Sequence, residues 1–269
     1  MADRRLEALY DIRSCSGDVP FGLLYTVVRK LDGKLFQMRA IEYSAYATRQ
    51  LALLEQEVRL ARCFKHPGLT RVVEVIHDTQ ARAYYLIQEH NASEGVIELI
   101  NGLSKEPLPE GRIITAVEQL CEALAVMHET TYRFEDETAN SSSVLFHGAI
   151  NPTNLCLTDD GMIKLVTLGI GREVHTGWSI LEHTPHKYRA YVAPELHESN
   201  TPTPSTDMWA LGVLLYELCT GHSYRPHQVE LPLNLADYPI LSPILTQLLS
   251  PDPSKRLKSA ALIGLLKSH

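Results

Sequence analysis

The order of the hydrophobic patterns along this 269-residue chain is the feature that most constrains its fold. In roughly the first ninety residues, short runs of β-branched and aromatic side chains alternate with turn residues, as in strands and hairpins. From about Glu94 onward, apolar residues recur at the spacing of amphipathic helices. A smaller β-rich part followed by a larger helical part predicts an α+β fold with strands and helices segregated along the chain.

Local signals place the main elements. Residues 23–43 predict a hairpin that turns at Asp32-Gly33, because two strand-like runs flank an Asp-Gly dipeptide. Ser205 or Thr206 is expected to cap the long helix near the C-terminus, and Gly221 to end it. Further strands are expected within 65–78 and over 83–89, a second hairpin around 159–161, and helices over 49–64, 111–131, 205–221, 241–250 and 257–268.

Composition excludes several classes of function. A net charge of -7 provides no basic field for nucleic acid or an anionic membrane. The N-terminus lacks the apolar core of a signal peptide, and no run reaches the ~18 apolar residues of a membrane helix. The scattered cysteines predict buried thiols in a reducing compartment; they are Cys15, Cys63, Cys121, Cys156 and Cys219. We therefore expect a soluble, cytoplasmic protein.

One segment resembles a functional loop. The sequence FHGAINPTNLCL, residues 146–157, places one histidine, one proline and two asparagines between apolar pairs. Loops of this kind hold polar groups at a fixed place on a rigid scaffold. Apart from His147, however, this loop contains no acid or base. It keeps the form of a catalytic loop without an evident catalyst.

The motifs in their order resemble a eukaryotic protein kinase domain over essentially the whole chain, and most of all the NIMA-related (NEK) family. GDVPFGLLY is similar to the glycine-rich loop, FQMRAI to the β3 segment that carries lysine, and EVRLARCFKHP to the end of helix αC. HGAINPTN stands where the family has HRDLKPxN, and KLVTLG where it has DFG. VAPEL, DMWALG and DPSKRL match three later motifs. The resemblance implies one bilobal domain over residues 1–269, with an N-lobe and hinge over about 1–91 and a C-lobe over 92–269.

The departures from the family pattern remove its chemistry. Phosphoryl transfer relies on positioning and charge neutralisation around Mg-ATP, with an aspartate that receives the substrate hydroxyl. By the resemblance, that aspartate corresponds to Ala149, the loop lysine to Asn151, and the DFG aspartate to Thr167. Mg²⁺ favours hard, charged oxygen ligands, so a threonine hydroxyl replaces a carboxylate poorly. Asn154 remains as the second metal ligand of the family pattern, which leaves no intact catalytic set.

The nucleotide end of the pattern is also altered. Arg39 stands in place of the β3 lysine, and it keeps the charge with a bulkier fork that can pair with Glu57. Val19 replaces a loop glycine, and Gln37 replaces the small residue that packs on adenine. The resemblance implies a vestigial nucleotide cleft formed by Gly17, Gly22, Leu24, Arg39, Glu57, Glu89, Asn154 and Cys156.

The structural residues of the pattern are retained. The resemblance implies that His147 anchors the loop and that Asp207 accepts backbone N–H groups beneath it. It also implies a buried ion pair between Glu195 and Arg256, which persists because losing one partner leaves a buried charge. Pro152 is expected to set the turn of the loop.

Several patterns have an ordinary interpretation beside a functional one. His183 and His186 are expected in an exposed loop instead of a metal site, and Asp159-Asp160-Gly161 in a turn. The polar stretch 132–143 is expected to be a solvated loop, with a docking or phosphorylation site as the alternative. SNTPTPSTD is a phosphorylation site or a loop with a helix cap. The segment between Cys219 and Leu241 is short for the family and predicts a reduced αG helix.

These observations predict a NEK-like pseudokinase that acts as a scaffold or allosteric regulator without phosphoryl transfer. The alternatives are a nucleotide-binding sensor and an atypical, weakly active ATP-dependent serine/threonine kinase. No cofactor is expected, although ATP without strong Mg²⁺ dependence stays open. The expected partner is a protein, either an active kinase or a cytoskeletal protein, and neither nucleic acid nor a membrane. The family implies a cytoplasmic location associated with the cytoskeleton.

Overall fold

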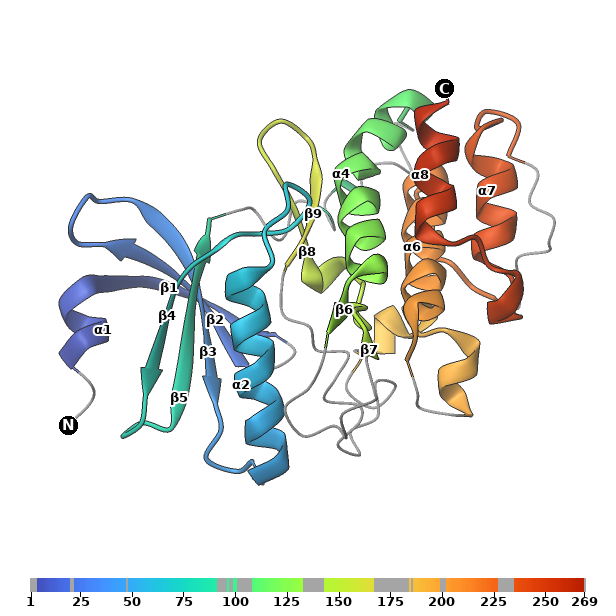
Figure 1. Ribbon diagram of the computed structural model, residues 1–269. Helices are drawn as coiled ribbons and strands as arrows, with labels where there is room; N and C mark the ends of the chain where they lie inside the picture. Colours follow the sequence, from blue (N-terminus) through green and yellow to red (C-terminus); the bar gives the residue numbers. More distant parts are fainter. Residues whose placement is uncertain are drawn as a thin grey trace. The chain divides into compact units, whose positions relative to one another are not determined.

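A five-stranded antiparallel sheet dominates the first part of the chain in the computed structural model (Figure 1). The structure describes residues 4–19, 22–46, 48–90, 96, 99–100, 108–132, 143–166, 184, 186–198, 202–226 and 235–268. They fall into two compact units. The first unit comprises Met1–His66 and Thr70–Ala92, and the second comprises Pro67–Leu69 and Ser93–His269.

The sheet of the first unit has the strand order β1-β2-β3-β5-β4. The strands are β1 (Tyr10–Val19), β2 (Gly22–Arg29), β3 (Leu35–Glu42), β4 (Val72–Asp78) and β5 (Ala83–Glu89), and helix α2 spans Thr48–Cys63. The predicted hairpin at Asp32-Gly33 is confirmed, because β2 pairs with β3 and Gly33 adopts a φ of +70°. The side chain of Arg29 binds both carboxylate oxygens of Asp32 and fixes the turn.

The N-terminal helix α1 (Arg4–Leu9) was not expected from the sequence. It is followed directly by β1, whose Tyr10 packs edge-on against Phe36 and donates a hydrogen bond to Glu74 at 2.8 Å. Leu6 of α1 packs against the same buried cluster. A helix of six residues is too short to show a period, and β1 is mainly polar, so neither element carries a clear sequence signal.

The second unit contains α4 (Glu110–Glu129), α6 (Pro204–Thr220), α7 (Leu241–Leu248) and α8 (Ser259–Lys267). Helix α6 is buried along most of its length, because its apolar residues cover all sides, and it packs against α4 and α7. Two small antiparallel pairs complete the unit: β6 (Thr131–Tyr132) with β7 (Ser143–Val144), and β8 (Leu155–Leu157) with β9 (Ile163–Leu165). A β-sheet unit and a helical unit confirm the α+β class.

Two local expectations were wrong. Helix α6 begins after Thr203 and not after Ser205 or Thr206, because Pro204 occupies the first helical turn. The Thr206 hydroxyl accepts from the Thr203 N–H at 3.3 Å, so Thr206 supports the cap from inside the helix. Gly221 ends the helix with a φ of +66°, as predicted.

The second wrong expectation is that the scattered cysteines are all buried. Cys15 is exposed, in contrast to the buried Cys121, Cys156 and Cys219.

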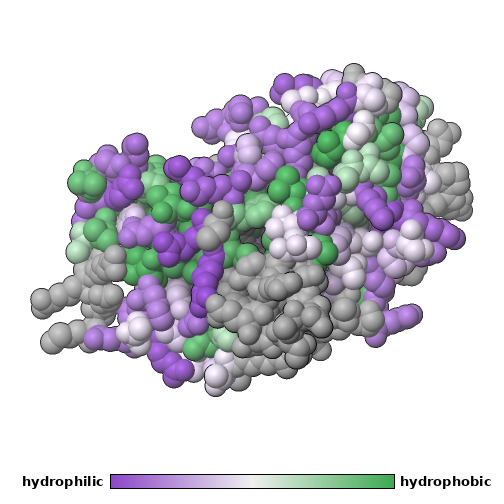
Figure 2. All heavy atoms as spheres, viewed as in Figure 1, coloured by the Kyte–Doolittle hydropathy of each residue, from purple (hydrophilic) through white to green (hydrophobic). Residues whose placement is uncertain are grey.

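The surface carries polar side chains over much of the face shown in Figure 2, with hydrophobic residues in smaller groups. The most exposed large apolar residues among those described are Leu31, Ile12 and Leu35 of the first unit. Within the described part of the chain, no helix has the length and apolar character needed to span a bilayer.

Candidate functional site

The residues of the predicted nucleotide cleft are divided between the two units, and each group has its own surroundings. In the first unit, Gly22 opens β2 with a φ of +122°, a conformation that side chains rarely adopt. A Cβ atom at this position would lie 2.0 Å from the carbonyl oxygen of Ala40 in the neighbouring strand. Glycine is therefore required here by the packing of β2 against β3, whether or not a nucleotide binds.

Arg39 is a buried cation in the middle of β3. It is 1% exposed, and it pairs across the sheet with Leu24 on β2 and Leu86 on β5. Burial lowers the pKa of its guanidinium to about 10, so the side chain still carries a charge at neutral pH. Gln37 lies two residues earlier on the same face and is also buried. The predicted Arg39–Glu57 pair stays a prediction, because the side chain of Glu57 lies outside the described part of the structure.

Helix α2 has a hydrogen bond to the sheet that sequence reasoning missed. The Tyr84 hydroxyl of β5 donates to the Glu55 carboxylate at 3.3 Å. The ring of Tyr84 stacks on His77 with centroids 4.2 Å apart, and His77 Nε2 lies 2.8 Å from the Tyr43 hydroxyl. These contacts join α2 to β4 and β5. Of the other predicted cleft residues, Gly17 pairs with Leu24, and Glu89 closes β5 with its N–H bound to the Arg71 carbonyl.

In the second unit, the loop from His147 to Asn154 is fixed by Asp207 of α6. The carboxylate accepts hydrogen bonds from the backbone N–H groups of His147 and Gly148, both at 2.7 Å. The ring of His147 is buried, with Nε2 3.3 Å from the Val166 carbonyl oxygen and Nδ1 accepting from the Ala149 N–H. The contacts expected of Asp207 and His147 are therefore present.

His128 is a third partner of Asp207, and no local sequence pattern indicates this contact. Its Nε2 lies 3.0 Å from the Asp207 carboxylate, and its Nδ1 lies 2.9 Å from the Ser259 hydroxyl. Three helices, α4, α6 and α8, thereby meet in one polar network beneath the loop. The partners lie 79 and 131 residues away in the sequence, a separation that no motif spacing can detect.

The positions to which the resemblance assigns the chemistry of the family hold small or neutral side chains. Ala149 presents a methyl group, and its carbonyl oxygen accepts from Asn154 Nδ2 at 2.8 Å and from Asn151 Nδ2 at 3.3 Å. Both asparagines are almost fully buried. Their amides close the loop around its own backbone, with Pro152–Asn154 forming a turn of 3₁₀ helix. Thr167 lies outside the described residues.

The retained ion pair of the pattern is extensive. Arg256 donates to Glu195 through Nη1 at 2.6 Å and through Nη2 at 2.7 Å, a bidentate geometry. The remaining donors reach the carbonyl oxygens of Ser250, Ser205 and Pro251, and the guanidinium lies over the ring of Trp209. Since the Arg256 side chain is 0% exposed, these contacts offset the cost of burying its charge.

A second set of contacts holds the segment 186–198 against α6. The Tyr191 hydroxyl donates to Glu217 at 2.7 Å, and Trp209 Nε1 donates to the Ala190 carbonyl at 2.9 Å. Burial raises the pKa of the Glu217 carboxyl, opposed in part by the hydrogen bonds from Tyr191 and Tyr224. This segment is therefore tied to the helix at several points along its length.

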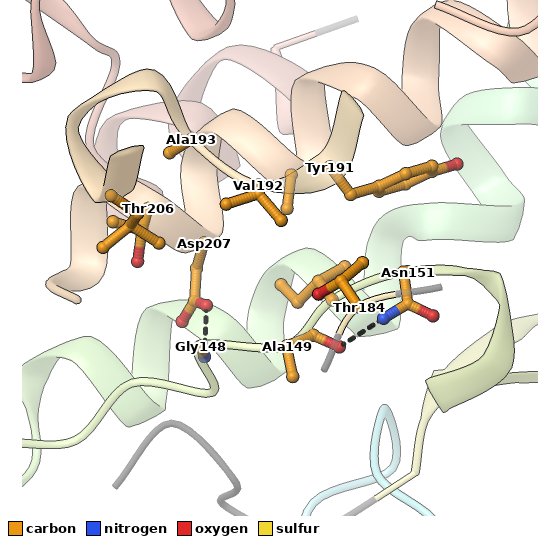
Figure 3. A pocket seen from close by; sticks show the side chains of 12 residues that line it. Gly148, Ala149, Asn151, Thr184, Tyr191, Val192, Ala193, Thr206 and Asp207 are labelled. Atoms are coloured by element: carbon orange, nitrogen blue, oxygen red, sulfur yellow. Dashed lines mark hydrogen bonds between the residues drawn. The ribbon is translucent and has the colours of Figure 1, made fainter. Parts of the chain in front are cut away.

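A pocket opens between that segment, the loop and α6, entirely within the second unit (Figure 3). Its empty space is about 300 Å³, open solvent included. Figure 3 shows Val192, Ala193 and Thr206 on one side of it and Ala149 on the other, with Asp207 at its edge. The complete lining is Gly148, Ala149, Ile150, Asn151, Thr184, Tyr191, Val192, Ala193, Leu196, Thr206, Asp207 and Ala210.

The described residues do not fit the Mg²⁺ of the family pattern. Within the described part of the chain, the buried Asn154 Oδ1 has no hydrogen-bond partner. It is a single neutral oxygen, whereas protein-bound Mg²⁺ takes one or two carboxylates. Within the described ranges, no cluster of three or more His, Cys, Asp or Glu side chains could hold a metal ion. Cys156 is buried in β8 with its thiol directed to the Lys164 carbonyl.

Comparison with known proteins agrees with this geometry. A family model described as protein kinase domain matches residues 16–264. A probable serine/threonine-protein kinase nek2 of Dictyostelium discoideum is 25% identical over 269 residues, covering 95% of this chain and 62% of the relative. Human serine/threonine-protein kinase Nek2 is 26% identical over 78% of this chain and 46% of its own length.

Relatives outside the NEK group are equally similar. Cyclin-dependent kinase F-4 of Oryza sativa is 28% identical over 80% of this chain and 42% of its own length. The chain thus spans roughly half the length of these three relatives.

Proposed function

Because the chain belongs to the protein kinase domain family and is related to NEK and other serine/threonine kinases, we propose that it is a pseudokinase. It uses the kinase fold as a scaffold or as an allosteric partner of another protein, and it does not transfer phosphoryl groups. The candidate partners are an active kinase and a cytoskeletal protein. We propose a cytoplasmic, cytoskeleton-associated location on the same family grounds.

The observation that carries this proposal is the environment of Ala149. A methyl group can neither accept the proton of a substrate hydroxyl nor orient it, and general-base assistance is worth about 10²–10⁴ in rate. The neighbouring amides of Asn151 and Asn154 bind the Ala149 carbonyl, so they hold the loop closed on itself. The loop is thus a well-ordered structure with no group in place to perform the reaction.

Phosphoryl transfer is the direct test. The purified protein is incubated with radiolabelled ATP, Mg²⁺ or Mn²⁺, and mixed peptide and protein substrates, beside an active NEK-type kinase as the control. We expect no transfer to substrate or to the chain itself above the level of protein-free buffer. Transfer that requires the intact chain and persists after removal of contaminating kinases would refute the proposal.

A nucleotide sensor is the second candidate, and Arg39 favours it. Burial in the sheet leaves this arginine charged, so a cation is retained where the family has its phosphate-binding lysine. Thermal unfolding with ATP, with and without Mg²⁺, separates the candidates. A ligand at ~100 times its dissociation constant stabilises a protein by ~2.7 kcal/mol. An unchanged melting temperature supports a scaffold. A rise that occurs without Mg²⁺ supports a sensor, and a rise that requires Mg²⁺ supports an enzyme.

A further inference from the structure

We propose that the turn between β2 and β3 is a docking surface for an anionic lipid bilayer, with Leu31 entering the membrane interface. This surface, the hairpin tip, consists of Leu9, Ile12 and residues 29–35. Docking of this kind is peripheral, and it goes beyond the pseudokinase function without depending on it. Three features of the turn support it: exposed apolar side chains, a rigid base and a local positive charge.

The hairpin tip gathers the most exposed apolar side chains of the described residues. Leu31 is 90% exposed, Ile12 56% and Leu35 50%, the three highest values among the large apolar residues. Leu9 is 36% exposed and lies beside the turn, because its carbonyl oxygen accepts from the Lys30 N–H. Single exposed apolar residues are normal on a protein surface, whereas a group of them marks an interaction site.

The turn presents Leu31 from a rigid base. Arg29 donates two hydrogen bonds to the Asp32 carboxylate, at 2.9 and 2.6 Å, and the Gly33 N–H donates to the Arg29 carbonyl at 2.8 Å. A preformed site loses little conformational entropy on binding. Leu31 can therefore enter a lipid interface without a rearrangement of the sheet.

The charge around the tip is positive although the chain as a whole is acidic. Residues 4–13 and 29–34 contain six basic and three acidic residues, which gives them a net charge of +3, against -7 for the whole chain. The acidic residues include Asp11, which pairs with Lys30 at 3.2 Å. Lys30 and Lys34 are exposed, one on each side of the tip leucine in the sequence. A chain with a negative net charge therefore still presents a positive end to an anionic membrane.

The composition of the tip favours lipid over protein as the partner. Protein interfaces are enriched in aromatic residues and depleted in lysine, whereas the tip combines exposed leucine with exposed lysine. Leucine enters the boundary between headgroups and acyl chains, and lysine keeps its ammonium group among the anionic headgroups. A fluid bilayer also adapts to the shape of the turn, so the contact requires no complementary groove.

Vesicle binding of the full chain is the direct test. Sedimentation with vesicles of phosphatidylcholine alone is compared with vesicles that contain about 30% phosphatidylserine, without nucleotide. We expect binding to the anionic vesicles, with at least about tenfold weaker binding to the neutral ones. Raising the NaCl concentration should release the protein, because salt screens the attraction. No binding to the anionic vesicles, or equal binding to both kinds, overturns the proposal.

A leucine variant tests the location. Leu31→Ser should weaken binding to the anionic vesicles by at least about tenfold, because it removes the apolar side chain that enters the interface. Its melting temperature should equal that of the wild type, since the side chain is almost fully exposed. Leu265→Ser, at an exposed leucine of α8, is the matched control and should bind as the wild type does. Equal binding by the Leu31 variant overturns the assignment to the hairpin tip.

A charge variant tests the electrostatic part. Lys34→Glu should weaken binding by at least about tenfold, because each basic residue at an anionic surface contributes about fivefold and the new acid repels it. Lys255→Glu, at a side chain that is 76% exposed in the second unit, is the matched control. Equal losses in the two lysine variants would show that net charge alone drives binding, which overturns the assignment.

Leu31→Trp provides a direct readout of insertion. Tryptophan favours the membrane interface, so the added fluorescence should shift to shorter wavelength and be quenched by lipids with brominated acyl chains. Fluorescence that stays unquenched while the protein is bound places the tip in water and overturns its insertion. None of these measurements involves ATP, so a failure of this proposal and a failure of the pseudokinase proposal appear in different experiments.

Discussion

The loop from His147 to Asn154 and the groups beneath it illustrate two different fates of polar residues in one fold. Asp207 beneath the loop and Arg256, which binds Glu195, keep dense sets of charged hydrogen bonds. On the loop itself, Ala149 and Asn151 are neutral at positions where the resemblance implies charged residues. The proposed pseudokinase function implies that such a chain keeps the anchoring contacts, which hold the backbone in place, without the reaction chemistry.

The largest expected effect tests the anchoring side of this comparison. Arg256→Ala leaves the Glu195 carboxylate without its bidentate partner and removes contacts to three carbonyl oxygens. We expect a loss of about 3–5 kcal/mol in the free energy of unfolding, measured by urea denaturation. Lys255→Ala is the matched control, because that side chain is 76% exposed and should matter by less than about 0.5 kcal/mol. Similarly small losses of stability in both variants would show that the contacts of Arg256 do not anchor the fold.

Gly22→Ala sharpens the comparison at a position that the resemblance assigns to the nucleotide cleft. The new Cβ would collide with the Ala40 carbonyl, and φ would remain at +122°. We expect a loss of about 2–3 kcal/mol in stability without any ligand present. Gly33→Ala, in an open turn at φ +70°, should cost only about 1 kcal/mol. If the Gly22→Ala variant is as stable as the wild type, the packing of β2 against β3 does not require this glycine.

His128→Ala is expected to have a smaller effect of about 1–2 kcal/mol, because it removes one partner each from Asp207 and Ser259 while the backbone donors remain. Chemical denaturation monitored by tryptophan fluorescence provides the measurement. His222→Ala serves as the control, since that side chain is exposed. If both histidine variants behave like the wild type, the network beneath the loop contributes no stability.

The smallest expected effect concerns Ala149→Asp, which restores one charged group of the family pattern. Stability should change by less than about 1 kcal/mol, because the position is only partly buried. We also expect no phosphoryl transfer, since Asn151 and Thr167 remain in place of charged residues and such residues act as a unit. Ala149→Ser is the control for packing. Measurable phosphoryl transfer by the aspartate variant would show that this single substitution is enough to provide the chemistry.

Much of the architecture could be predicted because short-range sequence patterns indicate its helices, strands and turns. The hairpin of β2 and β3 follows from two apolar runs around Asp32-Gly33, α4 from its apolar spacing, and α6 from a long apolar segment that ends at Gly221. The contacts of Asp207 and Arg256 were accessible only through the resemblance to a family. Their partners are distant in the sequence, and composition alone carries no information about them.

The contacts that could not be predicted arise from tertiary packing, which leaves no periodic pattern in the sequence. The pair of Glu55 with Tyr84 and the meeting of His128 with Asp207 and Ser259 arise where elements cross. The cap at Thr203 had an available signal, because a threonine directly before a proline favours the start of a helix. The predicted reduction of αG falls largely on residues 227–234, outside the described part of the chain, and stays a prediction.

The short ladder of β6 and β7 has a consequence for how this chain can vary. Thr131 pairs with Val144 and Tyr132 with Ser143, so the two ends of the ten-residue stretch 133–142 are held side by side. The entropy cost of closing a loop grows slowly, by about 0.6 kcal/mol for each doubling of its length. Insertions or deletions at this point should therefore be tolerated, and an epitope or a fluorescent reporter could be grafted there with little cost to the fold.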